Sequence, residues 1–268
     1  MQANLPVEPA PPFVATDSIV RTIWGDADTI LLIFAGAAAE FALNRAVDWL
    51  FFTGAIPGDP VGRLFTTAEY AQQIVFADQA TAYHTLSRIA HIHQAVEHQR
   101  RQQIPDWAHR DVLYMLIAYS ERAYRLHQRS LTDSECSELY AVFRRVGEAL
   151  GIDKLPPTYA EWQVDRKQHL REDLNYSSLT AQLYHRYREV LGWWRYGLLV
   201  TIQGVLVPGY VRELLRLRRW SGLHHSVKFY HVLTQFGLRP LILRMLLPAQ
   251  YLAQLERLEI AKREHLAT

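Results

Sequence analysis

The spacing of hydrophobic positions indicates helices along almost the whole chain. Apolar residues recur every three or four positions in most segments, and no segment has the strict alternation of apolar and polar residues expected of a strand. Turn-forming clusters, such as Gly-Ala-Ile-Pro-Gly at 54–58 and the prolines at 156–157, separate these segments. The pattern therefore predicts an all-α protein.

Capping signals place several of the predicted helix starts. Asp59 before Pro60 is a typical helix start, because the carboxylate can accept from free backbone N–H groups and proline suits the first helical position. Thr132 and Thr158 each open a capping box, since a glutamate follows three residues later. The predicted helices are 17–24, 29–44 with an extension through 52, 60–77, 79–99, 106–129, 132–151, 158–173, 178–191, 193–206, 209–219, 221–236 and 238–262.

Two helices have features that predict their packing. Gly36, in the alanine-rich helix 29–44, allows another helix to approach closely because it has no side chain. On the helix 106–129 we expect one apolar face to point inward. That face consists of Val112, Leu116, Tyr119 and Ala123.

The helices are expected to form one domain. Residues 1–15 begin with a proline-rich stretch, which predicts a flexible N-terminal arm and lacks the basic and apolar regions of a secretory signal. A length of 268 residues suits one large domain or two small ones. Pro156-Pro157 is the only candidate boundary, and the helices on its two sides are similar in character. We therefore predict a single domain over residues 16–268, in a globular all-α fold.

Composition excludes several classes of function. The net charge of +2 gives no general reason to expect nucleic acid as a partner. The single cysteine, Cys136, excludes an intramolecular disulfide, a Cys-x-x-Cys zinc site and covalent attachment of c-type haem. One cysteine fits a reducing compartment, so we expect a cytoplasmic protein.

Three features of the sequence could indicate contact with a membrane. Residues 190–209 are apolar over nearly the length of a membrane span, but Arg195 and the closing Pro208-Gly209 make a core helix the better interpretation. Trp193-Trp194 could lie at a membrane interface, although aromatic clusters are more often core packing. Four arginines form a basic patch, either an ordinary solvated face or a contact for anionic lipid. They are Arg212, Arg216, Arg218 and Arg219.

One histidine of the helix 79–99 points toward the protein interior. With about 100° per residue, the apolar residues of this helix lie within about 60° of His93. His84, His91 and His98 lie on the opposite side, so the neighbouring His91 and His93 cannot chelate one ion. The apolar residues are Leu86, Ile89, Ala90 and Val96.

Arg63 and Thr67 lie four residues apart, on one face of the preceding helix, and could act on the same group. A single inward imidazole beside an apolar pocket suits an axial haem ligand, with an arginine for a propionate or an oxygen species. The ordinary alternatives are a core histidine at position 93, a surface arginine and an exposed threonine hydroxyl. Periodicity alone favours these alternatives.

Short motifs in a fixed order carry a resemblance to a known family. In chain order they are Ile23-Trp24-Gly25-Asp26 with Phe34-Ala35-Gly36, Asp59-Pro60-x-x-Arg63-x-x-x-Thr67, Ile92-His93-x-x-Val96, Leu131-Thr132-x-x-Glu135 and Gly151-Ile152-x-x-Leu155-Pro156. With this set, residues 18–157 resemble the family of bacterial latex-clearing rubber oxygenases and the fungal mycophenolic-acid oxygenase. The resemblance covers about half of the chain.

This resemblance implies an all-α fold with a globin-like core and a non-covalent haem b. By position, His93 would be the proximal iron ligand, and Arg63 and Thr67 would be cofactor-binding and catalytic residues near the haem. The implied activity is an oxygenase that uses O2 on a small apolar unsaturated substrate, isoprenoid or lipid-like, with oxidative C=C cleavage as a candidate reaction.

The sequence departs from the family pattern at two places. Thr66 occupies the position where rubber oxygenases have a lysine, and Asn44-Arg45 replaces a His-Pro pair that many members have. Rubber is therefore not the expected substrate. Two alternatives stay open: a haem-free helical module that docks at a membrane or partner through Trp193, Trp194 and the basic patch, and a haem protein without oxygenase turnover.

Overall fold

Helices account for almost all regular structure in the part of the chain that the structure describes, residues 10–52, 58–220 and 222–266 of a computed structural model. These residues contain no β-strand, only two isolated bridges, Pro12 with Asp78 and Asn44 with Leu174. The all-α, single-domain prediction is confirmed. The helices are α1 (Ile19–Trp24), α2 (Ala27–Phe41), α3 (Val47–Phe52), α5 (Pro60–Val75), α6 (Gln79–Arg100), α7 (Asp106–His127), α8 (Asp133–Ala149), α9 (Tyr159–Glu172), α10 (Ser178–Leu206), α11 (Gly209–Leu214), α12 (Leu223–Gln235), α13 (Arg239–Leu246) and α14 (Ala249–Leu266).

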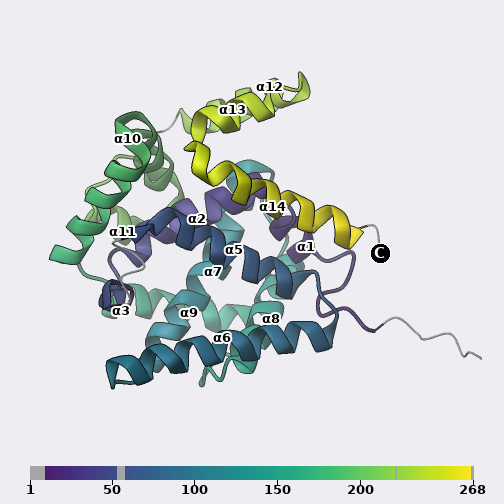
Figure 1. The fold of residues 1–268 in the computed structure, drawn as a ribbon, viewed down its shortest axis with the longest axis vertical. Helices are drawn as coiled ribbons and strands as arrows, with labels where there is room; N and C mark the ends of the chain where they lie inside the picture. The colour runs from purple at the N-terminus through teal and green to yellow at the C-terminus, as the bar shows by residue number, and fades with distance from the viewer. Residues whose placement is uncertain (1–9, 53–57, 221, 267–268) are drawn as a thin grey trace, which may run out of the picture.

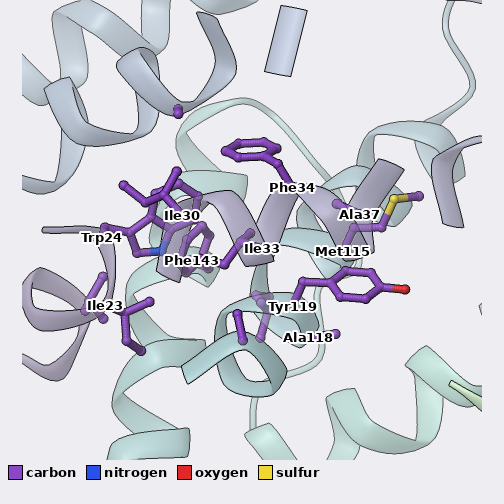
Figure 2. Close-up of a cluster of buried hydrophobic side chains, with 14 of the residues drawn as sticks. Ile23, Trp24, Ile30, Ile33, Phe34, Ala37, Met115, Ala118, Tyr119 and Phe143 are labelled. Carbon is purple, nitrogen blue, oxygen red and sulfur yellow. The ribbon is translucent and has the colours of Figure 1, made fainter. Parts of the chain in front are cut away.

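The helices surround a core in which α2 packs along α7 (Figure 1). Figure 2 shows apolar side chains of α1, α2, α7 and α8 gathered there, including Trp24 and Phe143. A Cβ atom on Gly36 would lie 2.3 Å from Cδ1 of Tyr119, so the predicted close approach at Gly36 is confirmed and its partner is α7. The globin-like arrangement of this core stays a prediction.

The inward face predicted for α7 is only partly right. Tyr119 and Ala123 are buried and Leu116 is half-buried, but Val112 is exposed. The first turns of α7 are buried instead through Asp111 and Leu113, because α7 runs through the middle of the domain and has neighbours on more than one side.

The helix starts were predicted well because they depend on local chemistry. Asp59 accepts a hydrogen bond from the Gly62 N–H, and Thr132 forms the complete capping box of α8. Thr158 caps α9 by accepting from the Glu161 N–H. Its capping box is incomplete, however, because the carboxylate of Glu161 accepts from the Thr158 hydroxyl rather than from the backbone N–H.

The C-terminal helices break at glycine, proline and left-handed residues. The predicted break between 191 and 193 is a kink in α10 at Gly192, where φ is 75°. The helix predicted over 209–219 ends at Leu214, since Arg216 is left-handed and the Leu217 N–H returns to the carbonyl of Arg212. The helix predicted over 238–262 is divided into α13 and α14 at Pro248, whose ring cannot continue a helix.

No helix in the described part of the chain is both long and apolar enough to cross a membrane.

The predicted N-terminal arm is only partly covered by the structure. Residues 1–9 lie outside the described residues. Residues 11–14 belong to the packed domain, because the Phe13 N–H donates to the carbonyl of Ala77 and the Phe13 side chain is 2% exposed. Arg145 donates to the carbonyl of Phe13 from α8. The packed domain therefore begins before residue 16.

Candidate functional site

The site around His93 is built by α5 and α6, which pack against each other. The start of α5 is held by Asp59, whose carboxylate accepts from the Gly62 N–H at 2.9 Å and from the hydroxyl of Tyr251 at 2.5 Å. This anchor fixes α5 to α14 one turn before Arg63. Along α6, the inward face brings His93 into electrostatic contact with Arg63.

His93 has the properties that its helical phase predicts. Its side chain is half-buried, whereas His84, His91 and His98 are exposed on the other side of α6. Burial lowers the pKa of His93 to about 4, and the positive charges of His109 and Arg63 contribute to the decrease. The imidazole is therefore neutral at pH 7, the form that binds a metal.

The ring nitrogens of His93 are free in the part of the chain that the structure describes. No hydrogen bond there involves either nitrogen, and the nearest ring is that of His109, with centroids 4.9 Å apart. Burial also lowers the pKa of His109. Two mainly neutral imidazoles thus lie side by side, next to one guanidinium group.

Arg63 and Thr67 share a face of α5 but are not both directed at His93. Arg63 is exposed and Thr67 is half-buried. The Thr67 hydroxyl donates to the Arg63 carbonyl at 3.1 Å, and the exposed Thr66 makes the same kind of bond to Gly62 at 3.2 Å. Of the three predicted site residues, Arg63 and His93 are electrostatically coupled, whereas the Thr67 hydroxyl is engaged within its own helix.

The inward face of α6 is incompletely covered. The only fully buried residues of this helix are Ala82, Thr85 and Leu86, all in its first two turns. Beyond Leu86, the inward residues are half-buried although they are apolar or neutral. They are Ile89, Ala90, His93 and Val96. This face therefore stays partly accessible beside His93.

His109 was missed by the sequence reasoning. It lies in the first turn of α7, four residues before the buried Leu113, and that spacing was the available signal. A histidine near a helix start is usually a solvated residue, so only its ring contact with His93 in the structure identifies His109 as a neighbour of that residue.

A concavity of about 500 Å³ lies between α7, α8 and the start of α9. Cys136 and Tyr159 line it, and the Tyr159 hydroxyl donates to the carboxylate of Glu121 at 2.9 Å. None of its lining residues belongs to α5 or α6. This cleft is therefore distinct from the His93 site.

Comparison with known proteins identifies the family. The sequence model described as "ER-bound oxygenase mpaB/B'/Rubber oxygenase, catalytic domain" matches residues 22–236, well beyond the half of the chain that carried the resemblance. No curated protein and no solved structure matches the chain significantly. The chain belongs to the family of ER-bound mpaB/B' oxygenases and rubber oxygenases, and residues 22–236 are its oxygenase catalytic domain.

Proposed function

We propose that this protein is a haem b oxygenase in which the imidazole of His93 would bind the haem iron. The observation that carries the proposal is the state of His93: a neutral, half-buried imidazole without a hydrogen-bonded partner among the described residues. The membership of the chain in an oxygenase family supplies the class of reaction.

The chemistry of the donor set fits haem better than a bare metal ion. Structural zinc takes four protein ligands and catalytic zinc three, whereas haem iron needs a single imidazole because the porphyrin supplies four nitrogens. The half-buried apolar residues of α6 suit the porphyrin faces, and Arg63 lies close enough to influence the charge of His93. Bound haem would supply the iron that activates O2.

The chain's own residues would then hold and orient the reactants. Arg63 would pair with a haem propionate or donate toward dioxygen, and Thr67 would donate from its hydroxyl after leaving the Arg63 carbonyl. Ile89 and Val96 would exclude water from this face of α6. The substrate that fits is a small apolar unsaturated molecule, isoprenoid or lipid-like, with oxidative C=C cleavage as the candidate reaction. Because Thr66 replaces the lysine of rubber oxygenases, we do not propose rubber.

The test is an absorption spectrum of the protein expressed with ample haem supply. We expect a Soret band that His93→Ala removes or displaces, because the axial ligand is lost. His91→Ala is the matched control, since His91 lies on the exposed side of the same helix and should leave the band unchanged. A colourless parent that does not take up added haemin would overturn the proposal.

Two further results would separate the alternatives. A band that survives His93→Ala and disappears in His109→Ala would move the ligand to His109, the adjacent imidazole. Bound haem without oxygen consumption, across isoprenoid and unsaturated lipid substrates, would instead favour a haem protein that has no oxygenase turnover.

A second candidate function, contact with an anionic membrane surface, rests on α12 and α13. These helices lie at the edge of the molecule opposite α6 (Figure 1). The sequence between Glu213 and Glu256 has no acidic residue, but it contains cationic residues such as Lys228 and Arg244. Large apolar side chains are exposed along the same stretch. They are Phe229, Val232, Phe236, Leu238, Leu241 and Met245.

The surface expected from the sequence lies outside α12 and α13 and is only partly exposed. Trp193 is 79% exposed, but Trp194 is half-buried with the guanidinium of Arg195 4.7 Å from its ring. Of the basic patch, Arg216, Arg218 and Arg219 are exposed and Arg212 is half-buried, donating to the carbonyl of Gly204.

We expect the protein to bind vesicles that contain phosphatidylserine more strongly than vesicles of phosphatidylcholine alone, with binding that weakens as salt is added. The double substitution Phe236→Ser with Leu241→Ser should reduce co-sedimentation with these vesicles. Val164→Ser, at an exposed site of α9, is the control and should have no effect. Equal binding to both kinds of vesicle, or none, would exclude the anionic-surface function.

A further inference from the structure

A second cluster of potential ligands is buried between α7 and the end of α9. His169 Nδ1 lies 2.7 Å from Oδ1 of Asp111 and 2.9 Å from Oδ2 of Asp173. The exposed fractions of these residues are 8% for His169, 1% for Asp111 and 8% for Asp173. Asp111 comes from α7, while His169 and the C-cap residue Asp173 are four positions apart on one face of α9.

The imidazole of His169 alone cannot hydrogen-bond both carboxylate oxygens. Nδ1 carries at most one hydrogen, yet two carboxylate oxygens approach it, so only one of them can receive a well-aligned hydrogen bond. Two buried carboxylates that meet at one point repel each other unless a proton or a cation lies between them. The C-terminal end of α9 adds the negative end of its dipole to the same place.

The surrounding charges leave a negative excess. A third carboxylate, that of Asp165, lies 3.8 Å from Nε2 of His169. Two arginines act on the cluster from a distance: Arg166 forms a buried ion pair with Glu40, and Arg45 is exposed and donates to the carbonyl of Glu172.

The outer contacts of the cluster orient the three donors. The amide of Asn44 donates to the second oxygen of Asp111 at 2.6 Å and is itself fixed by the Ala46 N–H. The Tyr114 hydroxyl donates at 2.5 Å to Asp165, the carboxylate that faces Nε2 of His169. Metal sites in proteins typically have such partners, with ligating carboxylates hydrogen-bonded and the remaining nitrogen of a ligating histidine facing a carboxylate.

We propose that His169 Nδ1, Asp111 Oδ1 and Asp173 Oδ2 bind one divalent transition-metal ion, of the Zn²⁺ or Mn²⁺ class. The donor atoms all lie within 4.8 Å of one another, so small side-chain shifts bring them to bonding distance of one ion. An imidazole with two carboxylates favours such an ion over Ca²⁺ or Mg²⁺, which prefer oxygen ligands only. Because the site connects α7 to the end of α9, the ion would hold these two helices together, and a non-protein ligand such as water would complete its coordination. The site is independent of haem at His93.

The test uses the full chain after treatment with a chelator. We expect the protein to bind one equivalent of Zn²⁺ or Mn²⁺, measured by isothermal titration calorimetry and by elemental analysis after desalting. At a free metal concentration of about 100 times Kd, the midpoint of thermal unfolding should rise by about 5 °C or more. Zinc and manganese are counted separately from iron, so the result does not depend on haem.

Matched substitutions locate the ion. Asp111→Asn and Asp173→Asn keep the size of the side chain and should each abolish binding of that equivalent. His185→Gln on α10 is the control, because His185 and Glu189 have the same spacing of four residues but are exposed. The control should bind one equivalent as the parent does.

Several outcomes would overturn the site. No metal retained by the parent and no change in its thermal midpoint would show that a proton alone occupies the cluster. Binding that persists in both asparagine variants would place the ion elsewhere, for example at the Asp26, Asp28 and His127 group. If the variants do not fold, the absorption spectrum of the parent protein with added Co²⁺ tests the site instead. Visible d–d bands support an ion bound by nitrogen and oxygen donors, and the absence of such bands contradicts the site.

Discussion

Glu40→Ala is expected to lower the free energy of unfolding by about 3–5 kcal/mol, because it leaves a buried arginine without its counter-ion. Glu40 is 0% exposed and forms an ion pair with Nη2 of Arg166, which is also buried. Its second carboxylate oxygen accepts from the hydroxyl of Tyr119 at 2.9 Å. Removal of the carboxylate thus leaves two buried polar groups, one of them charged, without their acceptor.

The size of this effect follows from what surrounds Arg166. Burial would lower the pKa of Arg166, but the charge and hydrogen bond of Glu40, together with the charges of Tyr119 and Asp111, raise it, and Glu40 is the largest of these stabilising contributions. Burial and the charge of Glu40 together raise the pKa of Tyr119 well above its ordinary value. The phenol therefore stays protonated and continues to need an acceptor.

Urea denaturation followed by circular dichroism measures this prediction. Glu40→Gln is the variant to compare, since its amide oxygen can still accept one hydrogen bond but carries no charge. We expect Glu40→Gln to lower the free energy of unfolding by less than Glu40→Ala does. Glu148→Ala removes a solvent-exposed i,i+4 partner of Arg144 and should change stability by less than about 1 kcal/mol. If Glu40→Ala lowered the free energy of unfolding no more than Glu148→Ala does, the fold would not depend on the buried ion pair of Glu40 with Arg166.

The features predicted correctly from sequence are those set by neighbours along the chain. Asp59 and Thr132 start helices because their own side chains accept from backbone groups three residues later. Gly192 breaks α10 because it can adopt a positive φ. The direction of His93 is likewise a consequence of helical phase, since Leu86 and Ile89 already define the inward face.

The features that could not be predicted from the sequence depend on contacts between segments that are distant along the chain. Val112 is exposed because the direction of the buried side of α7 depends on which helices surround it, not on its own period. Asp111 pairs with His169 across 58 positions, and Glu40 pairs with Arg166 across 126. Spacing along the chain carries no information about such pairs. The candidate haem site could be predicted in part because one of its helices has a clear phase, whereas the second cluster could not be predicted at all.

The remaining large effect is expected at the crossing of α2 and α7. Gly36→Val should lower the free energy of unfolding by about 3 kcal/mol, because over-packing a tight core typically costs about 1–3 kcal/mol and here the contact is unusually short. The new Cβ would lie 2.3 Å from Cδ1 and 2.5 Å from Cε1 of Tyr119. The ring cannot move away easily, since Tyr119 is fully buried and its hydroxyl is bonded to Glu40.

Gly197→Val is the matched control for this substitution. Gly197 also lies within a helix, α10, but no atom is found within 4 Å of the Cβ that a side chain would add there. Valine has a better helix propensity than glycine by a few tenths of a kcal/mol, so the control should be neutral or slightly stabilising. Chemical denaturation of both variants separates the steric effect from the change in backbone propensity. Equal stability of the two variants would mean that α2 and α7 do not approach each other as closely as Gly36 and Tyr119 indicate.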